Sequence, residues 1–450
     1  MQPSPTPTAR PSDSRAGRGG LAVTLGLIAT AVLAPVLTGW TVYSRLDPTT
    51  PGSIDPIVAI LDPQWIGPGT VPALLVAVIG VLHGPRWAET VRWRTLLTGA
   101  TAASLAWLVS LATIRGGSGI GDVLARRSEY LPTARAMDVT VALDTWISRI
   151  PLGAEDNWPV HVAGHPPLAT LFFVGLDRIG LGSGAAAGLA VCLVASTTTA
   201  AVLVTLRRLG TEEHARTAAP FLVLTPAALW MAVSADAAFA ALATWGLAAL
   251  AVAGTTTGRC RVAAASAAGL LLGAAVMCSY GLPLLGVMAL AVLVLARSWR
   301  PLPIAVLAAL VPVAVFAVAG FSWWEAFPVL RERYWDGLAS RRPAAYWTWA
   351  NLASLAIACG PWVGAGLAVL AARRREASRV VLVLVGAAVT SVLLADLSQM
   401  SRAEVERIWL PWMPWLTLAV VVLPPRWRRP ALVGQVVWAL ALETLLRTAW

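Results

Sequence analysis

The apolar run Leu21-Ala-Val-Thr-Leu-Gly-Leu-Ile-Ala-Thr-Ala-Val-Leu-Ala-Pro-Val-Leu-Thr-Gly-Trp-Thr-Val42 sets the class of this protein. It contains no charged residue, and about 20 such residues in a helix are enough to cross the hydrocarbon layer of a membrane. The run is too long for the apolar part of a secretory signal peptide, and no convincing cleavage site follows it. We therefore expect it to form the first transmembrane helix.

The rest of the chain has the same character. Of its 450 residues, 57% are hydrophobic and only 13% are charged, and the mean hydropathy is +0.70. About a quarter of the residues of a soluble domain are charged, so this composition excludes an ordinary soluble protein. The formal charge of +11 comes from arginines in short clusters between apolar runs, as orientation in a membrane requires. Membrane orientation therefore explains the charge better than nucleic-acid binding does.

The order of apolar runs and arginine clusters predicts an all-α polytopic membrane protein with about 13 transmembrane helices. Residues 1–20 are rich in Pro, Ser and Arg, so we expect a disordered cytoplasmic tail. Residues 21–450 are then one transmembrane domain of the plasma membrane, with the amino terminus in the cytoplasm.

This topology places three polar segments outside the membrane: residues 115–182, 321–349 and 397–409. In the first, apolar residues recur at helical spacing from Val139 to Ile150 while charged residues lie elsewhere on the wheel, which predicts a helix lying in the membrane interface. The apolar stretch Leu168–Leu176 is too short to cross the bilayer and is expected to be a juxtamembrane or re-entrant piece.

Two polar motifs stand out within the first segment. They are Glu129-Tyr-Leu-Pro-Thr-Ala-Arg135 and His161-Val-Ala-Gly-His-Pro-Pro-Leu168. A chain that is otherwise almost entirely membrane has little reason to keep carboxylates and histidines in a loop unless the loop meets a substrate. We expect any chemistry to be located there.

The cysteines give no sign of a disulfide framework or of a metal centre. Cys192, Cys278 and Cys359 lie in apolar runs, and Cys260 lies in a basic turn, so none looks like half of an extracellular disulfide. No ligand spacing typical of a metal site is present. The sequence predicts neither a metal nor another cofactor.

In combination, these features resemble the GT-C superfamily of membrane glycosyltransferases, closest to the protein O-mannosyltransferase-like, aminoarabinose-transferase and Rgt-like enzymes. The resemblance covers Ser104 to Gly254: an outward helix, a loop carboxylate, an interfacial helix, a His-Pro-Pro-Leu turn and a small-residue-rich helix that ends in Leu206-Arg-Arg-Leu-Gly210. Two later pieces, Gly337–Pro343 and Glu404–Trp409, look like parts of actinobacterial integral membrane proteins placed beside this superfamily. The chain differs in having two helices before the loop and Ser128-Glu129 where an Asp-Glu pair is common.

The resemblance implies transfer of a sugar from a polyprenyl-phosphate carrier to a glycan, glycolipid or protein acceptor on the outer face of the membrane, with no role for nucleic acid. A loop carboxylate would act as the general base, and cations would stabilise the leaving phosphate. Glu129 is the first choice for the base and Asp122 the second. The proposed substrate-binding residues are His161, His165, Arg341, Arg342, Glu404 and Arg407.

Each of these residues also has a structural interpretation. Glu129 can pair with neighbouring arginines, His165 can fix the double-proline turn, and Glu404 and Arg407 can form an ion pair on one helical face. Arg341 and Arg342 can hold lipid headgroups. Trp409 to Trp415 suggest an interfacial aromatic belt, and Glu443 is an intramembrane charge without an identified partner. At the level of function, a transporter or flippase of lipid-linked intermediates, or a non-catalytic scaffold of an envelope-assembly complex, are the alternatives.

Overall fold

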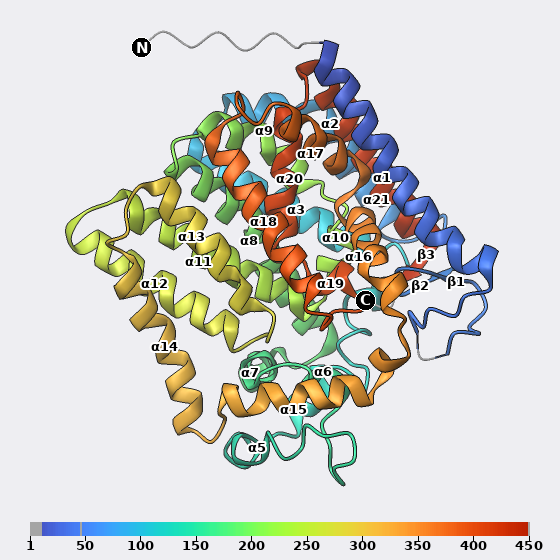
Figure 1. The fold of residues 1–450 in the computed structure, drawn as a ribbon, viewed down its shortest axis with the longest axis vertical. Helices are drawn as coiled ribbons and strands as arrows, with labels where there is room; N and C mark the ends of the chain where they lie inside the picture. Colours follow the sequence, from blue (N-terminus) through green and yellow to red (C-terminus); the bar gives the residue numbers. More distant parts are fainter. Residues whose placement is uncertain (1–10, 46, 449–450) are drawn as a thin grey trace.

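The computed structural model describes residues 11–45 and 47–448, whose regular secondary structure is nearly all helical (Figure 1). In this part of the chain, seven helices are long and apolar enough to cross a membrane. This confirms a membrane-embedded, predominantly α-helical protein. The seven helices are α1 (Pro11–Thr38), α2 (Thr70–Thr90), α3 (Trp93–Ala112), α8 (Gly184–Arg208), α11 (Ala235–Thr255), α12 (Gly258–Val276) and α18 (Arg379–Leu397).

Two bent pairs of helices are together also long and apolar enough to cross a membrane. The first pair is α14 (Leu302–Val318) and α15 (Trp323–Asp336), with a bend of 74°, and the second is α16 (Ala344–Cys359) and α17 (Pro361–Ala372), with a bend of 105°. The second bend falls at Gly360, whose φ of +83° is accessible to glycine at little cost, directly before a proline that begins the next helix. Counting each pair as one span gives nine in the described residues.

The expected number of about 13 spans is not confirmed. The difference lies in four apolar runs that form α9 (Glu212–Val223), α13 (Leu285–Ala296), α20 (Met413–Thr417) with η5 (Leu418–Val422), and α21 (Pro425–Leu445). The first two have 12 residues each and are therefore about 18 Å long, against about 30 Å of hydrocarbon. The last begins with a cluster of arginines that lowers its hydropathy.

Closely packed small residues hold the long helices together. A Cβ added to Gly269 or Gly273 of α12 would lie 2.1 or 2.2 Å from the carbonyl oxygens of Ala305 and Ala309 in α14, so only glycine permits this backbone approach. Such small-residue contacts drive helix association in membranes, where lipid removes most of the hydrophobic driving force. One cluster of buried apolar side chains extends from Ile28 to Leu446.

The first helix corrects the expectation for residues 1–20. It begins at Pro11, so residues 11–20 are helical and not disordered; residues 1–10 lie outside the described part. Buried Asp13 pairs with Arg373 beyond α17, and Ser14 accepts a hydrogen bond from Arg426 in the first turn of α21. These polar contacts to distant segments order the end of the helix, which its composition alone did not indicate.

The segment 115–182 contains only short helices. They are η1 (Gly117–Ile120), α4 (Tyr130–Arg135), α5 (Val139–Thr145), α6 (Val160–Ala163), α7 (Pro167–Leu176) and the π-helical η2 (Asp177–Leu181). Asp138 caps α5 by accepting hydrogen bonds from the backbone N–H groups of Thr140 and Val141. The helix α7 has 10 residues, so the apolar stretch near Leu168 is a short helix, as the sequence predicted.

The three segments 115–182, 321–349 and 397–409 meet on one side of the molecule, which we call the loop face. Arg333 of α15 donates hydrogen bonds to the backbone carbonyls of Ile150 and Trp158, and the phenol of Tyr334 accepts one from the N–H of Arg402. In Figure 1 the segments around α5, α6, α7 and α15 lie together at the lower end of the bundle. The sequence predicted that these segments share a side of the membrane.

A small antiparallel sheet was not expected from the sequence. It pairs β1 (Ser53–Ile54), β2 (Ala59–Leu61) and β3 (Leu446–Thr448), in that order. The sheet ties the chain end to the segment between α1 and α2. Beside it, the Glu443 carboxylate lies 3.8 Å from the guanidinium of Arg115, which supplies the partner that the sequence did not identify.

The tryptophans Trp409, Trp412 and Trp415 do not form an interfacial belt. Their side chains are buried, with exposed fractions of 0 to 2%, because α20 and the turns before it pack among α8, α9, α16 and α18. Trp324 on α15, in contrast, is 57% exposed, as expected of an interfacial residue.

Candidate active site

A carboxylate and a histidine form the centre of the candidate site. The Glu129 carboxylate lies 2.7 Å from Nδ1 of His161, and the two side chains are 7% and 12% exposed. Glu129 directly precedes α4 with an extended backbone, and His161 lies on the single turn of α6. The backbone N–H of His161 also donates to the carbonyl of Ser128. The two motifs that the sequence singled out are therefore in direct contact.

An aromatic residue packs against this pair and links it to the second histidine. The Tyr130 ring lies 6.3 Å from the ring of His161 and 5.8 Å from that of His165, and it stacks on Phe173 of α7. Tyr130 is almost fully buried. It was not among the predicted site residues, although it directly follows Glu129 in the sequence.

His165 is held as a neutral imidazole. Its Nδ1–H donates to the carbonyl of Cys278 at 2.9 Å, so Nε2 carries the lone pair. Burial lowers the pKa of His165, and the opposing charge of Asp236 does not reverse this effect. The residue can accept a proton or a hydrogen bond at Nε2 at neutral pH.

A chain of charged side chains, all buried except the partly exposed Glu404, lies next to these aromatic residues. The Arg407 guanidinium lies 2.6 Å from the carboxylate of Asp236 and 3.0 Å from that of Glu404, and Arg342 lies 3.2 Å from the other Glu404 oxygen. Asp236 begins α11, whereas Arg407 belongs to α19 (Val405–Ile408). Segments about 170 residues apart thus share a buried ion pair, which is stable only because each charge has a partner.

The charge chain and the Glu129–His161 pair form one site. Burial raises the pKa of Tyr130 well above its ordinary value, and the charge of Asp236 adds to the effect. Burial alone would raise the pKa of Glu404, but the charges of Arg342, Arg407 and His161 together lower it to about 2. Glu404 is therefore ionised at physiological pH.

Arg342 is held in a cage of oxygen atoms. Its guanidinium donates to the backbone carbonyls of Tyr43, Ser44 and Arg402 as well as to Glu404. Only 6% of its side chain is exposed. In this arrangement Arg342 fastens the three surrounding segments to one another, and binding a phosphate would require it to leave several of these contacts.

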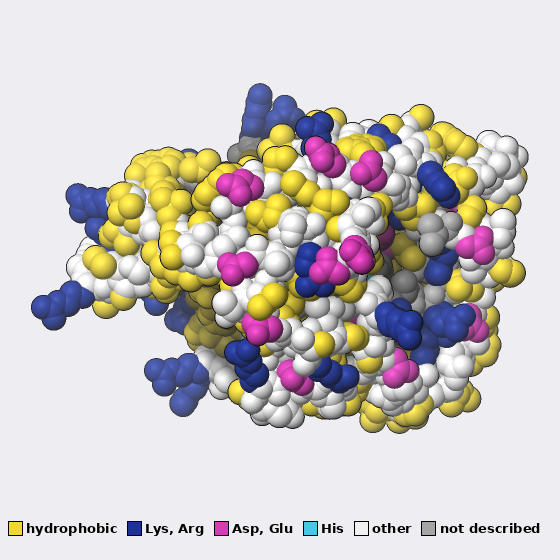
Figure 2. Space-filling model, turned by 90° about the horizontal axis from the view of Figure 1, so that it is seen from below, with side chains coloured by type: hydrophobic (Ala, Val, Ile, Leu, Met, Phe, Trp, Pro, Cys, Tyr) yellow, Lys and Arg dark blue, Asp and Glu magenta, His cyan; other side chains and the backbone are white. Residues whose placement is uncertain are grey.

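Two predicted site residues are not among the buried side chains of the site. The side chains of Asp122 and Arg341 are exposed, whereas Glu129, His161, His165, Arg342, Glu404 and Arg407 come together. Figure 2 shows the molecule from below the view of Figure 1, with arginines and acidic side chains spread among apolar ones over this face. Of the two carboxylates that the sequence singled out, Glu129 is buried beside a histidine and Asp122 is exposed.

An apolar pocket of about 490 Å³ lies next to His165. Phe239 and Cys278 line the pocket, and both also contact His165. The Phe239 ring lies 5.6 Å from the imidazole ring, and the Cys278 carbonyl accepts the hydrogen bond from Nδ1. Phe172 of α7, Trp245 of α11 and Leu271 of α12 line it further into the bundle. The site therefore combines ionisable groups with a pocket suited to an apolar chain.

Asp236 is the main functional candidate that sequence reasoning missed. The available signal was a carboxylate at the start of an apolar run, since an ionisable group in a membrane segment is expected to have a partner. Its partner Arg407 lies too far along the chain to be found by spacing.

Within residues 11–45 and 47–448, no three side chains of His, Cys, Asp or Glu are grouped so as to hold a metal ion. No family model matches the chain, and no curated protein matches it.

Proposed function

We propose that this protein is a GT-C-type membrane glycosyltransferase, which moves a sugar from a polyprenyl-phosphate carrier to an acceptor hydroxyl. The loop face then lies on the outer side of the plasma membrane, and the amino terminus lies in the cytoplasm. The observation that carries the proposal is the buried Glu129–His161 pair, which is linked through Tyr130 and His165 to Phe239 in the wall of an apolar pocket of about 490 Å³. A group-transfer enzyme with a lipid-linked substrate needs both features.

The proposed step uses the pair as a general base. The acceptor hydroxyl gives its proton to the Glu129–His161 pair while its oxygen bonds to the anomeric carbon of the sugar. The bond between that carbon and the carrier phosphate breaks, and its electrons leave with polyprenyl phosphate. His161 holds the carboxylate in place through the 2.7 Å contact, and Arg341, whose side chain is exposed, is the cation proposed to meet the phosphate.

The test is transfer from a panel of radiolabelled polyprenyl-phosphate sugars by the purified protein in liposomes that contain extracted envelope acceptors. Glu129→Gln keeps the shape of the side chain but removes the base, so we expect a loss of about 10² to 10⁴ in rate. Glu155→Gln, an exposed carboxylate of the same loop, is the matched control and should retain full transfer. Donor binding should persist in both variants.

Two additional variants test the roles of Asp122 and His161. Asp122→Asn is expected to be active, because this carboxylate is exposed. His161→Ala should be slow and should recover in part with added imidazole if the ring takes part in proton transfer. Full transfer by Glu129→Gln would remove the loop carboxylate from the mechanism.

A transporter of lipid-linked intermediates remains the second candidate. The two bent helix pairs and the buried Asp236–Arg407 pair favour it, since broken helices and buried charges are features of transport proteins. Movement of a labelled carrier across the liposome membrane without sugar transfer would select this function. A non-catalytic scaffold would show neither activity.

A further inference from the structure

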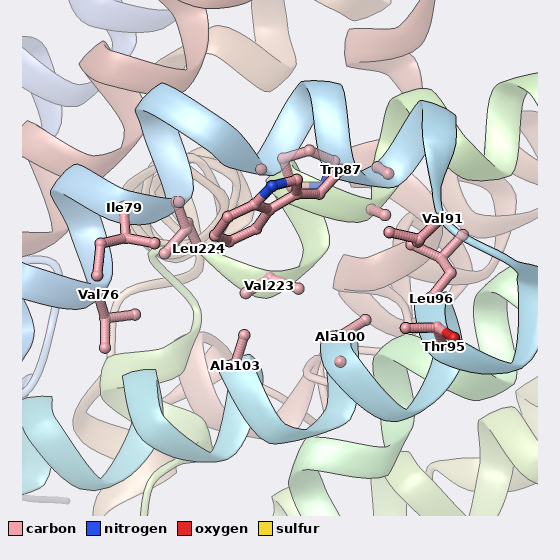
Figure 3. A pocket seen from close by; sticks show the side chains of 16 residues that line it. Val76, Ile79, Trp87, Val91, Thr95, Leu96, Ala100, Ala103, Val223 and Leu224 are labelled. Atoms are coloured by element: carbon pink, nitrogen blue, oxygen red, sulfur yellow. The ribbon is translucent and has the colours of Figure 1, made fainter.

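A second apolar groove lies away from the candidate active site, between α2, α3 and α9 (Figure 3). Its volume is about 470 Å³. Val76 and Ile79 lie at one end and Val91 and Thr95 at the other, with Trp87 over the middle, as Figure 3 shows. The groove follows α3 from Thr95 to Ala103, a rise of about 12 Å along the helix axis. Its elongated shape fits a hydrocarbon chain.

The groove opens to the surroundings of the helix bundle. Ile79 is 45% exposed and Trp87 is 51% exposed, and both are on helix surfaces that meet lipid if α2 and α3 cross the membrane. Leu224, directly after α9, forms part of the floor, and a Cβ on Gly80 would lie 2.7 Å from its Cδ1 atom. The absence of a side chain at Gly80 therefore lets α2 pack onto this floor.

One end of the groove is positively charged. Arg86, Arg92 and Arg94 are exposed on and beside the turn between α2 and α3, together with a single carboxylate, Glu89. This turn lies opposite the loop face, because α2 starts beside Thr113 and runs on for 21 residues, about 30 Å.

The turn is also rigidly held. Arg216 of α9 donates hydrogen bonds to the backbone carbonyls of Ala88, Glu89 and Val91. The guanidinium of Arg207 lies 4.5 Å above the ring of Trp93. The arginines that flank the groove are therefore presented from a fixed backbone.

From the apolar groove and its arginine-bearing end, we infer that the protein binds an anionic phospholipid here. One acyl chain lies between α2 and α3, and the phosphate lies against Arg92 and Arg94. Arginines near a membrane surface attract anionic headgroups, and guanidinium groups bind phosphate by paired hydrogen bonds. This inference does not depend on the proposed transferase activity.

Native mass spectrometry of the delipidated protein tests the inference, with phosphatidylglycerol and phosphatidylcholine of identical acyl chains as probes. The wild type should bind phosphatidylglycerol more tightly. Gly99→Leu should abolish this adduct, because the glycine lines the groove and a Cβ there meets no atom within 4 Å. The added side chain then fills the groove without a clash.

Gly286→Leu on α13 is the matched control, since this exposed glycine also has no atom within 4 Å of an added Cβ and does not line the groove. It should bind as the wild type does. Ala103→Leu provides a second groove-filling variant if Gly99→Leu does not fold.

A second set of variants tests the contact between the arginines and the lipid headgroup. Replacing Arg92 and Arg94 with Gln should weaken phosphatidylglycerol binding about tenfold and phosphatidylcholine binding less, because phosphatidylcholine has no net negative charge, whereas Arg374→Gln with Arg375→Gln should have no effect. Equal lipid binding by Gly99→Leu and Gly286→Leu would overturn the site. Loss of a dimer in Gly99→Leu without any change in lipid binding would assign the groove to a second copy of the chain.

Discussion

Glu406 offers the sharpest test of the structure, because it is a fully buried carboxyl group. Its exposed fraction is 0%. One oxygen, Oε1, accepts a hydrogen bond of 3.1 Å from the backbone N–H of Val58, and within the described residues Oε2 has no hydrogen-bond partner. An ionised carboxylate in this position loses its hydration, and backbone N–H groups of Val58 and of Glu406 itself replace only part of it.

The pKa of Glu406 is accordingly raised from its ordinary value of 4.5 to about 7. Burial is the main cause of this increase, and the charge of Glu404 raises the pKa further. The hydrogen bond from the Val58 N–H and the charge of Arg407 lower the pKa. Between pH 4.5 and about 7 the folded protein holds a proton that the unfolded chain has released. The free energy of unfolding therefore falls as the pH rises through this window, and the loss is complete above about pH 7.

The change in pKa corresponds to about 3 kcal/mol. Glu406→Gln imitates the protonated form and cannot ionise, so it should be more stable than the wild type by about that amount near pH 8. Near pH 4.5 the difference should be smaller than about 1 kcal/mol. Thermal unfolding of both proteins in detergent at the two pH values measures this change.

Glu155→Gln is the control for removing a carboxylate, because its side chain is exposed; its melting temperature should match the wild type at both pH values. Two results would refute the reasoning. Either Glu406→Gln melts below the wild type near pH 8, or its advantage is the same at both pH values. The first would mean that the ionised carboxylate makes favourable contacts, and the second that ionisation is not involved.

Three other predictions follow from single contacts. Arg407→Gln should destabilise the protein by about 3 to 5 kcal/mol, because it leaves the buried Asp236 carboxylate unpaired; exposed Arg341→Gln should be neutral in the same thermal assay, and equal melting temperatures would contradict the pairing. Gly273→Val should disrupt the packing of α12 on α14, since its Cβ would lie 2.2 Å from a backbone oxygen, and an unchanged yield of folded protein in detergent would argue against that contact. A cysteine at exposed Gly153, in a chain without its native cysteines, should react with an impermeant maleimide on intact spheroplasts; labelling only after lysis would place the loop face in the cytoplasm.

Much of the fold could be predicted because membrane composition constrains each segment locally. A stretch such as Leu21–Val42 must form a helix, since lipid offers no partners for its backbone N–H and C=O groups. The same argument predicted a predominantly helical, membrane-embedded chain, which the structure confirms. It failed for the number of spans. An apolar run of 12 residues such as α13 has the composition of a transmembrane helix, although it is too short to cross the bilayer alone.

The candidate site was partly predictable for a different reason. Glu129, His161 and His165 lie within 40 residues of one another in a polar segment, so composition alone drew attention to them. Their contact, however, depends on where α4 and α6 pack, and spacing could not separate Glu129 from the exposed Asp122.

What the sequence determined by itself is the membrane class, the helical content and the segments that carry polar chemistry, because these follow from local hydropathy. Only the tertiary structure decided the partners. Asp236 meets Arg407, Glu443 meets Arg115, and Arg342 is caged by backbone carbonyls. A buried charge is stable only beside an opposite charge or a ring of dipoles, and which distant segment supplies it depends on the packing of the whole bundle.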